Sequence, residues 1–194
     1  MHPPIAILKE TEDWLVVAKP PALLTHGHPR FPKEVSLIER LQIQCDQPLF
    51  IVHRLDRGAS GCLLISKKSH CVSPLKEALA KGRKSYLALV RGVYRGPSPY
   101  LLEKAMKVNG VLKAARSEIV LLASQDQPRS SLLLVHPHTG RYHQVRRHVR
   151  DTTHPILGDS EHGDSKVNRW WRTEMGLQRL ALHALAIDLD ICKE

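Results

Sequence analysis

The segment HRLDRGASG, from His53 to Gly61, places a single carboxylate among cations. Asp56 stands between Arg54 and Arg57, and small residues and glycines follow it. Nearby positive charge favours the ionised form of a carboxyl group, so we expect Asp56 to stay charged. An ionised carboxylate in a fixed position can serve as a general base or as a covalent nucleophile. A structural Asp–Arg ion pair is the alternative, and it is the commoner role of such residues.

The segment RYHQVRRHVR (141–150) gathers four arginines and two histidines. At helical spacing, Tyr142, Arg146 and Arg150 share one stripe, and two valines lie on an apolar stripe beside it. A cationic helix with its back in the core is suited to face phosphate groups. An ordinary solvated basic face is the alternative, and the segment alone does not decide between the two.

Tyr86 follows a basic turn in the segment KSYLALVRG (84–92), whose alternating side chains predict a strand. A tyrosine ring can stack on a nucleic-acid base while its hydroxyl group makes a hydrogen bond. The alternative is a half-buried tyrosine of the core, which is the better explanation for a single tyrosine taken alone.

The segment HPILGDSEHGD contains residue types that bind metal ions: His154, Asp159, His162 and Asp164. Their spacing fits neither the HExxH helix nor the EF-hand loop. The glycines and the proline favour a shaped loop instead. We therefore expect no metal site here. A metal-dependent nuclease built on this loop is the alternative; a chelator would abolish its activity, which we do not expect.

The composition indicates the kind of partner and the cellular setting. The 194 residues include 29 Lys and Arg against 19 Asp and Glu, which gives a formal charge of +10 and favours nucleic acid as the partner. The four cysteines include no CxxC pair, which favours reduced thiols over a disulfide framework or a zinc site. No apolar run approaches the roughly 20 residues of a membrane span, and no signal-peptide pattern is present. We expect a soluble, cytoplasmic monomer without membrane contacts.

The elements that must position these residues are mostly strands. Alternating or β-branched segments predict strands at 14–19, 50–53, 62–67, 84–92, 116–124, 130–137 and 180–190. Helical spacing predicts helices at 37–44, 73–81 and 141–152, and a loop from 153 to 168. We expect an α+β fold with a mixed, mainly antiparallel sheet flanked by helices, in a single domain over 1–194.

Four ordered motifs resemble the pseudouridine synthases that modify uridines of ribosomal and transfer RNA. The catalytic loop of that family is commonly HRLDxxTSG; here it is HRLDRGASG, with Ala59 where threonine is usual. KSYLALVRG is similar to the family's K-x-Y-x-A-x-V-x-G, and PHTGRYHQVRRH to its P-x-T-G-R-x-H-Q-I-R-x-H. The fourth motif is a HPILGD run with a late LHA strand after it, present here as HPILGD and LALHA. The resemblance covers about 12–189, and four ordered motifs are far more specific than one.

Within this family, GDSEHGD, VNRWW and GLQRLALHA are similar to the tRNA pseudouridine synthase C branch, which acts on the uridine at position 65 of tRNA. The ribosomal branches more often have a tyrosine in place of His162. The resemblance therefore implies a tRNA substrate, with ribosomal RNA as the alternative. We expect no separate N-terminal RNA-binding domain before Trp14, so the catalytic domain itself would recognise the RNA.

The resemblance also implies roles for the candidate residues. Asp56 would be the catalytic aspartate, Tyr86 would stack on the flipped uracil, and Arg146 would pair with Asp56 and keep it ionised. Arg54 would enter the RNA where the base has left. The other residues predicted to bind substrate or RNA are His53, Arg57, Arg141, His143, Gln144, Arg147, Arg150 and Leu182. Neither a metal nor an organic cofactor is implied. A non-catalytic RNA-binding module is the alternative from another functional class.

Overall fold

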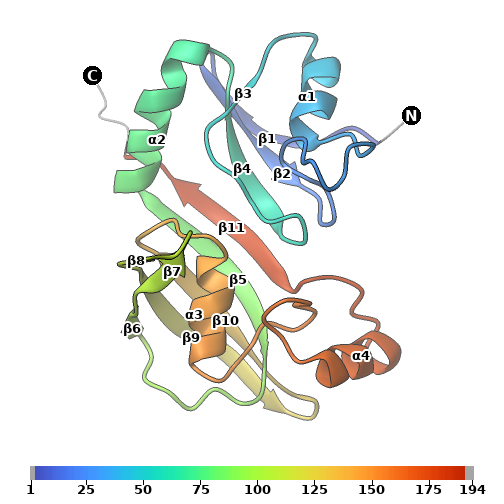
Figure 1. The fold of residues 1–194 in the computed structure, drawn as a ribbon, viewed down its shortest axis with the longest axis vertical. Helices are drawn as coiled ribbons and strands as arrows, with labels where there is room; N and C mark the ends of the chain where they lie inside the picture. Colours follow the sequence, from blue (N-terminus) through green and yellow to red (C-terminus); the bar gives the residue numbers. More distant parts are fainter. Residues whose placement is uncertain (1–2, 191–194) are drawn as a thin grey trace. The chain divides into compact units, whose positions relative to one another are not determined.

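The computed structural model describes residues 3–190 (Figure 1). The chain divides into two compact units, Met1–Arg83 with Ala184–Glu194 and Lys84–His183. It passes from one unit to the other within β5 (Arg83–Arg91) and again within β11 (Leu182–Asp188). Among the described residues, no helix combines the length and the apolar character that a membrane span requires.

The first unit contains an antiparallel sheet centred on β4 (Ser60–Ser66). β1 (Ile7–Glu10) pairs with β2 (Trp14–Lys19), β2 pairs with β4, and the short β3 (Phe50–Ile51) also pairs with β4. On the side opposite β2, β4 also neighbours β11. Gly61 permits this close approach: a Cβ there would lie 2.1 Å from the carbonyl oxygen of Ala184, so a side chain does not fit.

Two helices complete the first unit. α1 (Leu37–Cys45) begins at a capping box in which the backbone N–H of Ser36 donates to the Glu39 carboxylate at 2.7 Å. α2 (Val72–Lys81) continues a 3₁₀ turn (Ser69–Cys71). Its buried Leu75 and Leu79 belong to one core cluster with Leu64 of β4 and with Val52, which directly follows β3.

The second unit has its own antiparallel run of strands, in the order β5, β10 (Arg129–Pro137), β9 (Arg116–Asp126) and β6 (Tyr100–Glu103). A separate hairpin joins β7 (Met106–Val108) to β8 (Val111–Lys113). The helix α3 (Gln144–Asp151) contacts β10. The helix α4 (Ser165–Glu174) completes the unit (Figure 1).

The predicted α+β class is confirmed. Three local predictions were wrong. The helix predicted from Arg141 begins only at Gln144, because His143 before it has a left-handed backbone with φ of 52°. The predicted loop to residue 168 contains the start of α4, whose N-cap Asp164 accepts the N–H groups of Lys166 and Val167. The short strands β1, β6, β7 and β8 were not predicted. The single domain over 1–194 stays a prediction.

Candidate functional site

The loop that carries Asp56 joins β3 to β4 and is fixed on both sides of this residue. Leu55 before it is buried, and its carbonyl accepts a hydrogen bond from the Thr25 hydroxyl at 3.0 Å. The N–H of Ala59 donates to the carbonyl of Asp56 at 3.1 Å and closes a turn. The Asp56 side chain is partly exposed. A carboxylate is thus presented from an immobilised backbone, as a base or nucleophile requires.

Lys19, at the end of β2, is hydrogen-bonded to this loop. Lys19 is only 1% exposed. Its ammonium group donates to the carbonyls of Pro20, Leu23 and Arg57 at 2.8, 2.7 and 3.2 Å. Burial lowers the pKa of Lys19 to about 8, and the Asp56 carboxylate acts in the opposite direction. Lys19 is therefore a buried cation that ties the Asp56 loop to the proline-containing segment after β2.

Sequence reasoning did not single out Lys19, although a signal was present. β2 alternates half-buried and buried residues, and Leu15 and Val17 are fully buried. Lys19 continues this alternation at the next inward-facing position. A lysine on the buried face of a strand must find hydrogen-bond partners, which makes it a candidate for a structural or functional role.

The cations that flank Asp56 have different local partners. Arg54 is exposed, and its guanidinium lies 3.2 Å from the Nε2 of His26, which must accept because a guanidinium only donates. Burial and, next, the Arg54 charge lower the pKa of His26. Arg57 pairs with Glu34 at 2.7 Å and covers the Phe31 ring at 4.5 Å. Both arginines are accessible to an anionic partner.

His53 has a structural contact inside this segment. Its Nε2 accepts the backbone N–H of Leu64, in β4, at 3.1 Å. One ring nitrogen therefore holds the loop against the strand, whereas a role of His53 in RNA binding stays a prediction.

In the second unit, Arg146 is buried rather than directed to solvent. Its Nε and Nη2 donate to the two carboxylate oxygens of Asp159 at 2.7 and 2.8 Å, and Asp159 also accepts the backbone N–H groups of Glu161 and His162. Burial acts to raise the pKa of Asp159, but these donors outweigh it and lower the pKa below its ordinary value. The predicted stripe was wrong for Tyr142, which precedes the helix, whereas Arg146 and Arg150 lie four residues apart on α3 and Arg146 is buried.

Gln144 braces the start of α3. Its carbonyl oxygen accepts from the Thr139 hydroxyl at 2.6 Å and from the N–H of Arg141 at 3.0 Å. Its amide nitrogen donates to the carbonyl of Arg116 at 2.9 Å and to the hydroxyl of Ser117 at 3.0 Å. The side-chain amide thus has a structural role, and its contact with RNA stays a prediction.

The other arginines of this segment are more accessible. Arg141 is half-buried and donates to the carbonyl of Ala114, and Arg147 is half-buried and donates to that of Lys107. Arg150 is exposed and pairs with Asp151 at 2.9 Å. These side chains keep contact with solvent, as phosphate binding requires.

The remaining candidates lie on strands or in loops. Tyr86 is half-buried on β5, opposite Val135 of β10, and Leu182 is buried at the start of β11. Of the four residues weighed as a metal set, Asp159 pairs with Arg146, Asp164 caps α4, and His154 lies 2.9 Å from the carbonyl of Arg91 through its Nδ1. His53, Arg54, Asp56 and Arg57 belong to the first unit, whereas the other candidates belong to the second.

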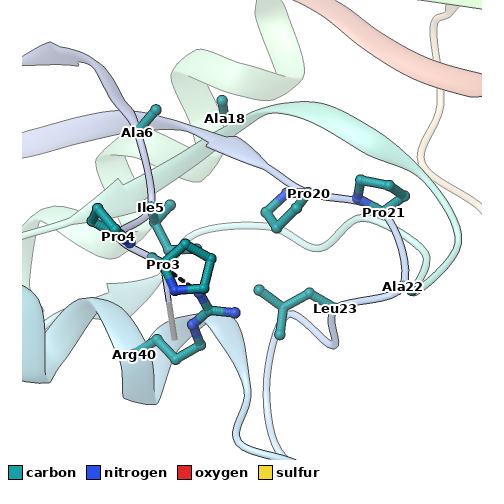
Figure 2. Close-up of a pocket in the computed structure, with 10 residues that line it drawn as sticks. All are labelled: Pro3, Pro4, Ile5, Ala6, Ala18, Pro20, Pro21, Ala22, Leu23 and Arg40. Atoms are coloured by element: carbon teal, nitrogen blue, oxygen red, sulfur yellow. Dashed lines mark hydrogen bonds between the residues drawn. The ribbon is translucent and has the colours of Figure 1, made fainter. Parts of the chain in front are cut away.

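A hollow of about 430 Å³ lies elsewhere in the first unit (Figure 2). It is lined on one side by Pro20, Pro21 and Leu23, and Arg40 of α1 donates to the carbonyl of Pro3 beside it. Its walls are mostly apolar and contain none of the residues predicted for catalysis or RNA binding. We assign it no part in the chemistry.

Comparisons with known proteins agree with the motifs. The family model described as RNA pseudouridylate synthase matches residues 13–151. The tRNA pseudouridine synthase C of Pasteurella multocida (strain Pm70) is 35% identical over 202 residues, which cover 93% of this chain and 83% of the relative. A ribosomal large subunit pseudouridine synthase C of Haemophilus ducreyi is 34% identical over 197 residues, which cover 95% of this chain and 61% of the relative. The solved human RNA pseudouridylate synthase domain containing 1 superposes with a TM-score of 0.76 at 24% identity, over 95% of this chain and 79% of that chain.

Proposed function

Because the chain belongs to the RNA pseudouridylate synthase family, we propose that it isomerises a uridine of tRNA to pseudouridine, at position 65. The observation that carries the proposal is the family match over residues 13–151, which includes Asp56, Tyr86 and Arg146. The family assignment from the sequence motifs is confirmed by this match. The position in the tRNA rests on the resemblance of the GDSEHGD and RLALHA segments alone.

The reaction rearranges the substrate without a co-reactant. The bond between C1′ of the ribose and N1 of uracil breaks, the base turns, and C1′ joins C5. The proton on C5 is lost, and N1 takes up a proton, so the product is an isomer of the substrate. A uridine inside a duplex must first be flipped out of the stack. We assign the first step to the Asp56 carboxylate, as a nucleophile or as a base toward the ribose.

The surroundings of Asp56 support this assignment. The turn at Ala59 and the hydrogen bond at Leu55 fix its backbone, and the buried Lys19 ammonium anchors the loop at Arg57. The charges of the Lys19 ammonium and the Asp56 carboxylate interact, which couples the buried cation to the proposed catalytic group. The pairing of Arg146 with Asp56 is proposed from the HQVR motif only. In the structure, two nitrogens of the Arg146 guanidinium donate to Asp159.

Tyr86 is proposed as the platform for the flipped uracil, because its ring is only half-buried on a regular strand. The accessible arginines are proposed to bind phosphate groups: Arg54, Arg57, Arg141, Arg147 and Arg150. Their charge agrees with the formal charge of +10 of the chain. We also propose that the enzyme acts as a monomer and works in the cytoplasm.

Ribosomal RNA is the second candidate substrate, because a relative named for the ribosomal large subunit is 34% identical. The resemblance of the GDSEHGD and RLALHA segments to the tRNA branch favours tRNA.

The test is tritium release from RNA that carries 5-tritiated uridine, because the isomerisation detaches the hydrogen at C5. Unmodified tRNA, a tRNA with cytidine at position 65 and ribosomal RNA are compared, with Asp56→Ala as the inactive control. We expect release from tRNA that disappears with either the position-65 change or the Asp56 change. Release from ribosomal RNA alone would overturn the tRNA assignment. Tight RNA binding without release from either RNA would indicate the non-catalytic module.

A further inference from the structure

Two histidines and a glutamate converge in the second unit, in a combination that the sequence motifs did not suggest. The Nδ1 of His143 lies 3.0 Å from the Nε2 of His162 and 3.7 Å from a carboxylate oxygen of Glu161. One ligand atom from each residue lies within 4.8 Å of the other two. We propose that His143, His162 and Glu161 bind a divalent transition-metal ion, with Zn²⁺ as the expected occupant.

The distances suit such an ion. With zinc–nitrogen and zinc–oxygen distances near 2.1 Å, the edges of a tetrahedral ligand shell are about 3.4 Å long. The observed separations from His143, 3.0 and 3.7 Å, lie on either side of this length. Two imidazoles with one carboxylate are a ligand set for zinc and its neighbours, whereas Mg²⁺ and Ca²⁺ prefer oxygen alone.

The backbone around the cluster is already held in place. A single carboxylate oxygen of Asp159 accepts the backbone N–H groups of Glu161 and His162 at 3.0 and 2.9 Å. The Tyr142 ring stacks on the His143 ring at 3.7 Å between centroids. The backbone that carries Glu161 and His162 is therefore ordered before an ion binds.

The charges near the cluster permit a cation. Burial lowers the pKa of His162, and neutral imidazole is the form that binds metal. The neighbouring Asp159 acts to raise that pKa, and Arg146 and Arg150 act to lower it. The Arg146 charge is compensated by its bidentate pair with Asp159, and Glu161 approaches Arg146 only at 3.5 Å. An ion at this place would replace the hydrogen bond between the two imidazoles and weaken the 3.5 Å ion pair of Glu161 with Arg146, and one ring proton would move to the other nitrogen of its histidine.

An entry path is present. His162 lines a hollow of about 580 Å³, together with Arg91, Arg150 and the start of α4. The two arginines pair with Asp164 and Asp151 at 2.9 Å, which reduces the repulsion of an approaching cation. The inference does not depend on the proposed function, and it makes the ion no participant in the isomerisation.

The test titrates the purified full-length protein with Zn²⁺ in a calorimeter, in the absence of RNA. We expect one site of micromolar affinity in the wild type. His162→Asn and Glu161→Gln should each weaken it by about tenfold or more. His70→Asn is the matched control, because His70 is an exposed histidine of the first unit, and it should bind as the wild type does. Co²⁺ in place of Zn²⁺ should give ligand-field bands without a thiolate charge-transfer band.

The same experiments can overturn the proposal. Absence of saturable Zn²⁺ binding would do so, and so would equal affinity in the wild type and in both cluster variants. A thiolate band with Co²⁺ would assign the ion to the cysteines instead. If His162→Asn does not fold by circular dichroism, Glu161→Gln decides, because the Glu161 side chain is 57% exposed and its change should leave the fold intact.

Discussion

Asp159 receives two hydrogen bonds from the Arg146 guanidinium, at 2.7 and 2.8 Å, where the two residues are only 1% and 5% exposed. The same carboxylate accepts the backbone N–H groups of Glu161 and His162. It therefore joins the helix with the HQVR motif to the GDSEHGD loop. In this protein the motif arginine depends for its orientation on a buried acid from a separate motif.

We predict that Asp159→Asn strongly destabilises the protein. Removing one partner of a buried ion pair leaves an uncompensated charge and typically costs about 3–5 kcal/mol. Urea unfolding followed by circular dichroism would measure the difference. Glu12→Gln is the control, because Glu12 pairs with Lys68 through a side chain that is 88% exposed, and it should change the stability little. Equal stability of Asp159→Asn and wild type would contradict a structural role for the pair.

The same pair predicts a sensitivity to acid. The pKa of Asp159 in the folded protein lies below its ordinary value of 3.8, so the unfolded chain binds the proton more readily. The stabilisation is complete above about pH 3.8 and is lost as the pH falls through the folded pKa. The unfolding free energy of the wild type should therefore fall more steeply in this acid window than that of Asp159→Asn. Parallel curves for the two proteins would exclude Asp159 as a source of the acid loss.

The sequence predicted the site better where the residues lie in short local motifs. The Asp56 loop and the Tyr86 strand depend on neighbouring residues, and the structure has them close to the predicted places. Lys19 and Asp159 could not be assigned in this way. Their roles depend on partners that the fold brings from elsewhere in the chain, such as Arg57 for Lys19 and Arg146 for Asp159.

The helix at the HQVR motif shows a second limit. Arginines at helical spacing predicted a cationic face, but helical spacing gives only the relative directions of side chains and leaves open which direction is buried. A buried acid on a neighbouring loop makes Arg146 an inward residue, and the left-handed backbone of His143 moves the helix start to Gln144. Neither feature has a signal within the helix itself.

Tyr86→Phe should separate stacking from proton transfer. The phenylalanine ring keeps the stacking surface but has no hydroxyl group to help remove the C5 proton. If that hydroxyl acts as a base, the rate of tritium release should fall by about 10²-fold or more at unchanged RNA affinity. Tyr100→Phe, a tyrosine of β6 in the same unit, should keep the wild-type rate. A wild-type rate for Tyr86→Phe would limit Tyr86 to a platform.

Arg147→Ala and Arg150→Ala should each weaken RNA binding and reduce its dependence on salt. A lost phosphate contact lowers the slope of log K against log salt concentration by about 1. Filter binding of tRNA at several salt concentrations would measure this slope. Lys76→Ala removes an exposed charge from α2 and should leave the slope unchanged. If both arginine variants keep the wild-type slope, α3 does not contact the phosphate groups.

Lys19 should make the stability rise with pH in the alkaline range. Its pKa is about 8 in the folded protein and about 10.5 in an unfolded chain, so between these values the unfolded chain binds more protons. The unfolding free energy should therefore rise from about pH 8 to 10.5, by at most about 3 kcal/mol. Lys19→Met removes the titrating group, so its unfolding free energy should not show this rise with pH. Lys76→Met is the control, and it should keep the rise seen in the wild type. The same pH slope in both variants would mean that the Lys19 ammonium titrates at its ordinary pKa, and that the three carbonyls around it offset the cost of its burial.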